Sequence, residues 1–359
     1  MDIMTTTPAD PMRLIRSRLH VDGSHTTSSL SQAVRRGEML RLRRSVYVPA
    51  SQWFQAYPWD RHLMAAAAHA LWRPDSVFCR ETALALHGLP LLRTPRVVHV
   101  RTARRQQVGR RRPAPMTGTA SDAVVREMLS RERGPEGQRL TAHDLNGVST
   151  RRVLTPEPSL DVEVLGGPPG LGQVLRVELL EAAVMDTLPR LRFDEAVVVL
   201  DALRAGRHRR PTELSQDSLG QWEHLLTSRM ATQRWTLAWE VSDPAAESPG
   251  ESLSRARMVE AGLLLPELQK VFDLPDGSRA RVDFWWPELG LVGEFDGKMK
   301  YTRARELSGV DVAQAVFEEK VREDQLRALG LGVVRWCWPE ASHPTSLGRL
   351  LREVGVPEG

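Results

Sequence analysis

The chain has 359 residues, a length that allows two or three domains, each with a buried core. Its two cysteines, Cys79 and Cys337, exclude a disulfide framework and a cysteine-rich zinc site. No apolar run approaches the roughly 18 residues of a membrane span, and the first residues lack the order of a signal peptide. We therefore expect a cytoplasmic protein without a membrane partner.

Positive charge is concentrated in the N-terminal part of the chain. Residues 1–160 contain 25 arginines, no lysine and 13 acidic residues, a net charge of about +12, whereas the whole chain carries only +4. A general preference for arginine over lysine would not explain the shortage of acids in this part. The asymmetry favours a polyanionic partner, and we predict DNA.

The first predicted elements are a capped helix and a two-stranded wing. Residues 26–29 offer N-caps, Leu30 and Val34 share one helix face, and Gly37 ends the helix. Residues 39–43 and 45–48 alternate like two short strands. The alternative to a DNA-binding module is a basic scaffold helix. Phosphate contacts are predicted for the arginines of this segment: Arg35, Arg36, Arg41, Arg43 and Arg44.

This segment resembles the winged helix-turn-helix of AbiEi-type antitoxins, through RRGE at residues 35–38 and VYV at residues 46–48. The family's second glycine is replaced by Ser45, and the helices before Ser24 are abbreviated. The resemblance implies a winged helix-turn-helix over residues 1–57 and a cognate toxin protein as a candidate partner.

Residues 58–245 are predicted to form a mixed α/β middle region. FCRETALALHGLP at residues 78–90 and the apolar strand at residues 97–101 resemble the same antitoxins, although Cys79 and Arg80 stand where the family has Ser-His. Residues 179–206 indicate two amphipathic helices, and residues 166–172 are too rich in proline for a phosphate-binding loop. We find no catalytic constellation here and predict a folding platform. The run Arg104–Arg112 is predicted to be a solvated loop that can also contact phosphate.

Residues 246–359 are predicted to form an α/β unit. The pattern indicates a helix over residues 248–262, then strands over residues 269–274, 280–286 and 291–296. A second helix follows, with an apolar face of Phe317, Val321, Leu326 and Leu329, and then a strand over residues 331–336.

Three carboxylates lie on or beside these apolar strands: Asp283, Glu294 and Asp296. Glu294 and Asp296 are two residues apart on a predicted strand, so both side chains are expected to point to one face. The alternative is that these two acids are ordinary solvated side chains on the face of an edge strand. Carboxylates on buried strands repel one another unless a cation lies among them, and hard oxygen ligands suit Mg²⁺ or Mn²⁺.

Lysines are rare in this chain, and three of the four follow the acids: Lys298, Lys300 and Lys320. An ammonium group near a metal site can stabilise charge that develops on a phosphate. The alternative is that they are ordinary solvated charges, with Lys320 paired to Asp324.

Residues 248–338 resemble the very-short-patch-repair-like branch of the PD-(D/E)XK nucleases. The matching stretches are SPGES at residues 248–252, RVDF at 281–284 and EFDG at 294–297. The resemblance implies an α/β multi-domain protein whose C-terminal restriction-endonuclease-like domain has a central mixed sheet flanked by helices. It also implies that Asp283 and Glu294 bind metal, with Glu251 as the supporting acid. Asp296 takes the position at which a typical member has lysine.

The implied activity is that of a Mg²⁺- or Mn²⁺-dependent endodeoxyribonuclease. Asp283, Glu294 and the carbonyl of Phe295 would hold the metal, and Asp296 or one of the three lysines would complete the catalytic group. The alternative is a transcriptional regulator or AbiEi-like antitoxin whose degenerate nuclease domain only binds nucleic acid. The residues leave open DNA versus RNA and the oligomeric state.

Overall fold

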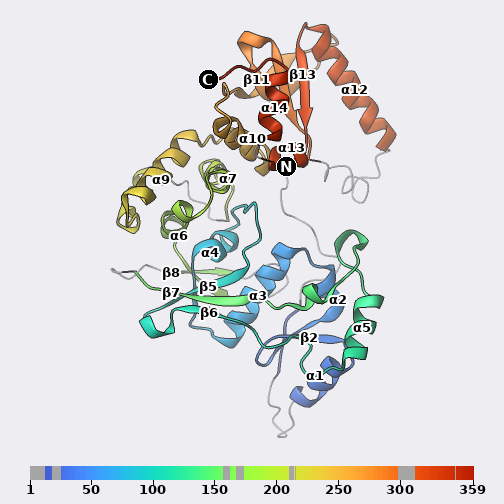
Figure 1. The fold of residues 1–359 in the computed structure, drawn as a ribbon, viewed down its shortest axis with the longest axis vertical. Coiled ribbons are helices and arrows are strands. Elements are labelled where there is room, and N and C mark those ends of the chain that lie inside the picture. Colours follow the sequence, from blue (N-terminus) through green and yellow to red (C-terminus); the bar gives the residue numbers. More distant parts are fainter. Residues whose placement is uncertain are drawn as a thin grey trace. The chain divides into compact units, whose positions relative to one another are not determined.

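The structure, a computed structural model, describes residues 13–17, 26–156, 162–166, 174–209, 214, 216–297, 312–343 and 345–359. The chain forms two compact α/β units (Figure 1). The first comprises Met1–Thr187 with Asp217–Leu225, and the second Leu188–Gln216 with Leu226–Gly359. Among the described residues, no helix has both the length and the apolar character needed to cross a membrane.

The first unit begins with a small sheet of order β1-β3-β2, formed by β1 (Ile15–Arg16), β2 (Met39–Arg43) and β3 (Val46–Pro49). Helix α1 (Thr26–Arg35) precedes the β2–β3 hairpin, so the predicted helix and wing strands are confirmed. In the described residues 13–17 and 26–38, α1 is the only helix before the hairpin. Ser45 turns the hairpin with φ 62°, the left-handed conformation that favours glycine.

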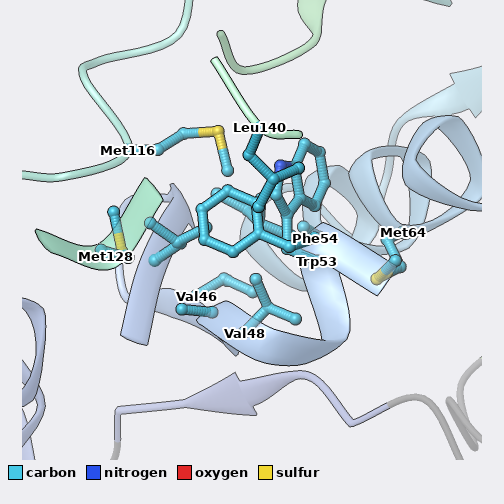
Figure 2. Packing of buried hydrophobic residues seen from close by; sticks show 12 residues of the cluster. Val46, Val48, Trp53, Phe54, Met64, Met116, Met128 and Leu140 are labelled. Carbon is cyan, nitrogen blue, oxygen red and sulfur yellow. The ribbon is translucent and has the colours of Figure 1, made fainter. Parts of the chain in front are cut away.

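The hairpin shares its core with later segments. Val46 and Val48 pack with Trp53 and Phe54 of α2 (Ala50–Gln55) and Met64 of α3 (Pro58–Trp72) (Figure 2). The same cluster contains Met116, Met128 and Leu140 from further along the chain. This core therefore crosses the boundary predicted at residue 57.

A six-stranded mixed sheet of order β6-β7-β5-β4-β9-β8 forms the rest of the first unit. Pairs β5–β7 and β4–β9 are parallel, and the other pairs are antiparallel. The strands are β4 (Val77–Phe78), β5 (Val97–Thr102), β6 (Gly109–Arg111), β7 (Ser149–Leu154), β8 (Val162–Gly166) and β9 (Val174–Glu178). The accompanying helices are α4 (Arg80–Leu86), α5 (Asp122–Arg131), α6 (Leu180–Thr187) and α8 (Gln216–Gly220).

The second unit contains a four-stranded sheet of order β10-β11-β12-β13. Its strands are β10 (Glu267–Asp273), β11 (Arg279–Trp286), β12 (Leu291–Phe295) and β13 (Gly332–Trp336); only the β12–β13 pair is parallel. Its helices are α7 (Phe193–Arg204), α9 (Arg229–Val241), α10 (Pro249–Glu260), α12 (Val312–Ala328), α13 (Trp338–Ser342) and α14 (Ser346–Glu353). The predicted order of helices and strands is confirmed over the described residues.

The predicted apolar face of α12 is wrong for three of its four residues. Leu326 is fully buried, but Phe317, Val321 and Leu329 are 63%, 38% and 42% exposed. The helix instead contributes ion pairs to the sheet, from Glu319, Arg322 and Glu323. Buried Leu326, which packs in the core of the sheet, and these ion pairs together join the helix to the sheet.

We predict that Ser45→Gly stabilises the first unit. Glycine adopts the left-handed conformation without the Cβ penalty, so the free energy of unfolding should rise by about 0.5 kcal/mol after the entropy cost of glycine. Urea unfolding of both variants measures this change. Ser45→Ala, which keeps the Cβ, should give no gain, and a less stable glycine variant would contradict the explanation.

Candidate functional site

The first acid of the candidate site lies in the first turn of α10. Ser248 caps the helix by accepting a hydrogen bond from the Glu251 backbone N–H (3.2 Å), and Pro249 occupies the first helical position. The Glu251 side chain is buried. Its Oε2 accepts hydrogen bonds from the Glu247 backbone N–H (2.8 Å) and from the Gln269 side-chain amide (2.9 Å).

Gln269 stands at an irregularity in β10. Its φ is 56°, unusual for a residue other than glycine, and the regular pairing with β11 skips it between Leu268↔Phe284 and Lys270↔Val282. The skipped position lies opposite Asp283. Strained backbone next to acidic side chains is frequent at functional sites. Sequence reasoning missed this residue, because a glutamine within a strand pattern carries no signal of its own.

Asp283 links the second and third strands of the sheet. Its Oδ2 accepts a hydrogen bond from the Phe295 backbone N–H (2.9 Å), just beyond the paired residues Phe284 and Gly293. Continuing this register places Asp283 opposite Glu294. The negative charge of Asp283 raises the pKa of Glu294 and also that of Glu251, so it lies within electrostatic reach of both glutamates.

Glu294 is buried on β12, a strand on which every residue is buried. Two arginines compensate its charge: Arg322 of α12 contacts Oε1, and Arg335, its neighbour on β13, contacts Oε2, both at 2.7 Å. Burial raises the pKa of Glu294, the two arginines lower it, and the net shift is upward. Arg335 also pairs with Glu319 (2.8 Å) and Glu323 (3.4 Å).

A glycine allows α10 to approach this strand. A Cβ atom on Gly250 would lie 1.9 Å from Cε1 of Phe295, whose ring packs edge-on against Trp338. Gly250 belongs to the SPGES stretch and Phe295 to the EFDG stretch. Their contact places the start of α10, which carries Glu251, beside the end of β12.

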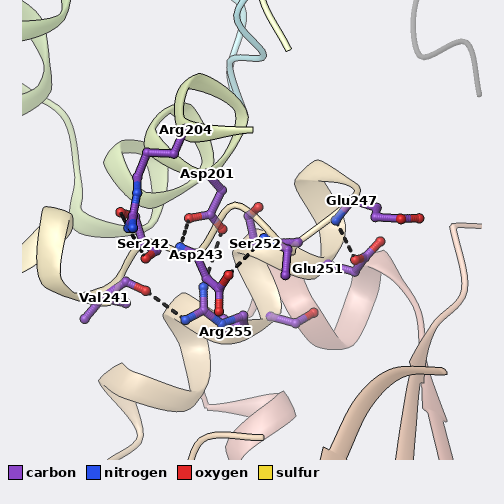
Figure 3. A network of polar contacts seen from close by, with 12 residues as sticks. Asp201, Arg204, Val241, Ser242, Asp243, Glu247, Glu251, Ser252 and Arg255 are labelled. Carbon is purple, nitrogen blue, oxygen red and sulfur yellow. Dashed lines mark hydrogen bonds and ion pairs between the residues drawn. The ribbon is translucent and has the colours of Figure 1, made fainter. Parts of the chain in front are cut away.

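Helix α10 is held in place by buried ion pairs within the second unit (Figure 3). Arg255 donates to the Val241 carbonyl (2.8 Å) and pairs with Asp201 at 3.6 Å. Asp201 accepts from the Asp243 backbone N–H (2.8 Å), and burial raises its pKa to about 6. This network fixes the helix that carries Glu251.

The remaining predicted site residues are placed differently. Asp296 follows β12 and is half-buried; within the described chain, no hydrogen bond or ion pair involves its carboxylate. Lys320 is exposed on α12 and forms no ion pair with Asp324 there. Lys298 and Lys300 lie outside the described residues.

The donor set suits a hard divalent cation, but its present geometry is not that of a metal cage. Glu251, Asp283 and Glu294 offer oxygen ligands, and their mutual repulsion and burial are conditions that a cation relieves. Over the described residues, no three His, Cys, Asp or Glu side chains are arranged to hold a metal ion. A bound cation would displace at least one arginine from Glu294.

The five predicted phosphate-binding arginines differ in how far they are exposed and in their partners. Arg43 is buried and donates to the carbonyls of Leu42 (2.8 Å) and Val148 (2.9 Å), so it holds the hairpin against a later segment of the chain. Arg36 is exposed but pairs with Glu38 (2.6 Å). Arg35, which donates to the Thr119 hydroxyl (3.3 Å), and Arg44 are exposed, and Arg41 is half-buried.

The middle of the chain contains a buried ion cluster that sequence reasoning missed. Arg101 forms a bidentate pair with Glu178 and contacts Asp186 at 2.7 Å, and Arg80 also reaches Asp186 at 3.2 Å. The two arginines balance the two carboxylates. This balance fits the predicted folding platform.

No family matches the chain, and no solved structure matches it. It is similar to two proteins from Mycobacterium tuberculosis strains, named "Uncharacterized protein Rv2248" and "Uncharacterized protein MT2308". Each is 33% identical over 93 residues, which is 26% of this chain and 31% of the relative. The chain thus spans about a third of the length of these relatives.

We predict that stability falls as the pH rises through the titration of Glu251. Burial, then Asp283, raise its folded-state pKa from 4.5 to about 7. The protonated form is therefore favoured by folding: the stabilisation is complete below about pH 4.5 and lost as the pH approaches and passes 7. The loss at pH 8 is about 3 kcal/mol. Urea unfolding in EDTA at pH 5 and pH 8 measures it.

Glu251→Gln should remove most of this pH dependence, because the amide oxygen still accepts both hydrogen bonds but carries no charge. Glu288→Gln, on an exposed turn, is the matched control and should leave the slope unchanged. An unaltered slope in Glu251→Gln would show that another group titrates.

We predict that Gly250→Ala destabilises the second unit by about 3 kcal/mol, because the added methyl group overlaps the ring of Phe295. Thermal and urea unfolding measure the loss. Gly297→Ala is the control, since its Cβ would lie at an ordinary 3.6 Å from the same ring. Equal stability of the two variants would mean that α10 moves away without cost.

Proposed function

We propose that the protein is a divalent-metal-dependent nuclease that hydrolyses phosphodiester bonds in DNA, with nucleic-acid-binding surfaces on its basic first unit. The supporting observation is the convergence of Glu251, Asp283 and Glu294 from α10, β11 and β12, with raised pKa values for both glutamates. Buried acids with perturbed pKa values that influence one another are frequent at catalytic sites. The order of helices and strands around them agrees with the resemblance to PD-(D/E)XK nucleases.

Each residue of the site has a role in this proposal. Asp283, Glu294 and Glu251 would hold the cation, which when bound polarises the scissile phosphate and acidifies a water molecule. Burial and the nearby Asp283 raise the pKa of Glu251 to about 7 in the absence of a cation, and a bound cation would favour its ionised, ligating form. Arg322 and Arg335 neutralise Glu294 in the absence of a cation, and either guanidinium can stabilise negative charge on the phosphate when released.

A second candidate is a DNA-binding regulator or AbiEi-like antitoxin whose nuclease-like domain does not cleave. It is favoured by the arginine pairs on both carboxylate oxygens of Glu294, which occupy the positions that a cation would need. A permanent arginine cluster around Glu294 would bind a phosphate backbone without activating water.

We predict that Asp283→Asn and Glu294→Gln each lower the cleavage rate by at least about 100-fold, because each removes a charged metal ligand. The assay incubates plasmid, single-stranded DNA and single-stranded RNA with Mg²⁺, with Mn²⁺ and with EDTA. Glu288→Gln, which changes the same chemical group at an exposed turn, should cleave at the wild-type rate.

The outcomes separate the two functions. Cleavage that persists in EDTA, or at the wild-type rate in Asp283→Asn, would contradict the metal-dependent mechanism. Binding of DNA without cleavage under any metal condition would favour the regulator. Loss of cleavage with unchanged binding in the two site variants would support the nuclease.

A further inference from the structure

The first unit contains a cavity of about 230 Å³, and six of its twelve lining residues are arginines. Its walls come from the turn of the β2–β3 hairpin, the end of α3, β6 with the residues after it, and β7. Its charged and aromatic lining includes Arg41, Arg44, Trp72, Arg111, Arg112 and Arg152.

Strand register explains why residues so far apart in sequence meet here. Arg111 of β6 lies directly opposite Thr150 of β7, so Arg111, Thr150 and Arg152 share one face of the sheet. Buried Arg43 donates to the Thr150 hydroxyl (3.3 Å) and the Val148 carbonyl (2.9 Å). These bonds hold the hairpin against that face and bring its arginines to the cavity.

The positive charge of the cavity is not compensated within the described part of the chain. The lining includes no acidic residue. In the described chain, no carboxylate forms an ion pair with any of the following arginines: Arg41, Arg44, Arg111, Arg112 and Arg152. Elsewhere in the unit, arginines do have acidic partners, such as Arg36 with Glu38 and Arg61 with Asp144.

Like charges in the cavity affect one another. Burial, then Arg111 and Arg73, lower the pKa of Arg152. Burial, then Arg43, Arg152 and Arg73, lower the pKa of His69 to about 3, so this histidine is neutral at physiological pH. An anion in the cavity would relieve the repulsion among the arginines.

We propose that this cavity binds a backbone phosphate of a nucleic acid. The proposal deepens the proposed function, since it takes the same ligand class and assigns where it is held. Arg44, Arg111 and Arg112 are exposed, so the cationic surface continues outside the cavity and can follow neighbouring phosphates. Trp72 lines the cavity and is 36% exposed, and the guanidinium of Arg73 lies over its ring at 4.9 Å, which adds a further cation beside the cavity.

The test is the affinity of the full chain for a fluorescent 20-nucleotide DNA, single- or double-stranded, measured by anisotropy in EDTA at several salt concentrations. Arg111→Gln with Arg112→Gln is the test variant, because both residues are exposed and their replacement preserves the fold. Arg126→Gln with Arg139→Gln is the matched control: it removes the same charge from two exposed arginines of the same unit, outside the cavity.

The test variant should bind at least about 10-fold more weakly. For duplex DNA, the slope of log affinity against log salt concentration should fall by the amount that corresponds to about two phosphate contacts. The control should stay within about 3-fold of wild type. Equal losses in the two variants, or no loss in either, would overturn the proposal. Arg152→Gln, which removes another charge of the cavity together with a hydrogen bond to the Gln107 side chain (3.1 Å), should show the same selective loss.

Two further arms separate this proposal from its alternatives. Tripolyphosphate that raises the melting temperature of wild type but not of the test variant, with DNA affinity unchanged, would identify a small-anion site and contradict the nucleic-acid assignment. Binding in EDTA and cleavage in Mg²⁺ are separate measurements, so a failure of the cavity assignment and a failure of the proposed nuclease activity are distinguishable.

Discussion

Burial of carboxylates in the small sheet of the second unit is the constraint on which the rest of that unit depends. A charge removed from water is costly unless it is paired, hydrogen-bonded or neutralised. Glu294 is paired with two arginines, whereas Glu251 accepts neutral N–H donors and has a pKa near 7. The polar side of α12, the arginine on β13 and the irregular backbone at Gln269 are all arranged around these two acids.

This arrangement requires close packing on the face of β12 that α10 covers. On the sheet, Gly293 leaves room for Trp336 and Trp286, and Gly250 leaves room for Phe295 at the helix. The Trp336 indole N–H donates to the Ser254 hydroxyl (2.8 Å), which ties β13 to α10. Glycine is thus needed where aromatic rings and backbone approach closely. The proposed chemistry depends on this precision, since a shift of α10 would separate Glu251 from Asp283.

Arginine has opposite roles in the two units. In the second unit, Arg255, Arg322 and Arg335 compensate buried acids and hold helices in place. In the first unit, the cavity beside Trp72 concentrates arginines that have no acidic partner in the described chain, and Arg43 holds the hairpin that supplies two of them. The net charge of the chain does not distinguish these roles, because it counts paired and unpaired guanidinium groups alike.

The sequence by itself determined the order of helices and strands in the second unit, the capped start of α10, and the helix and hairpin of the first unit. These features follow from local periodicity and turn chemistry, which neighbouring residues set. It also indicated Asp283, Glu294 and Glu251. Only the tertiary structure decided that Phe317 is exposed, that Arg43 is buried, that two arginines hold Glu294 and that Gln269 contacts Glu251. Those outcomes depend on contacts between residues distant in the chain, where the cost of an uncompensated buried charge outweighs local preference.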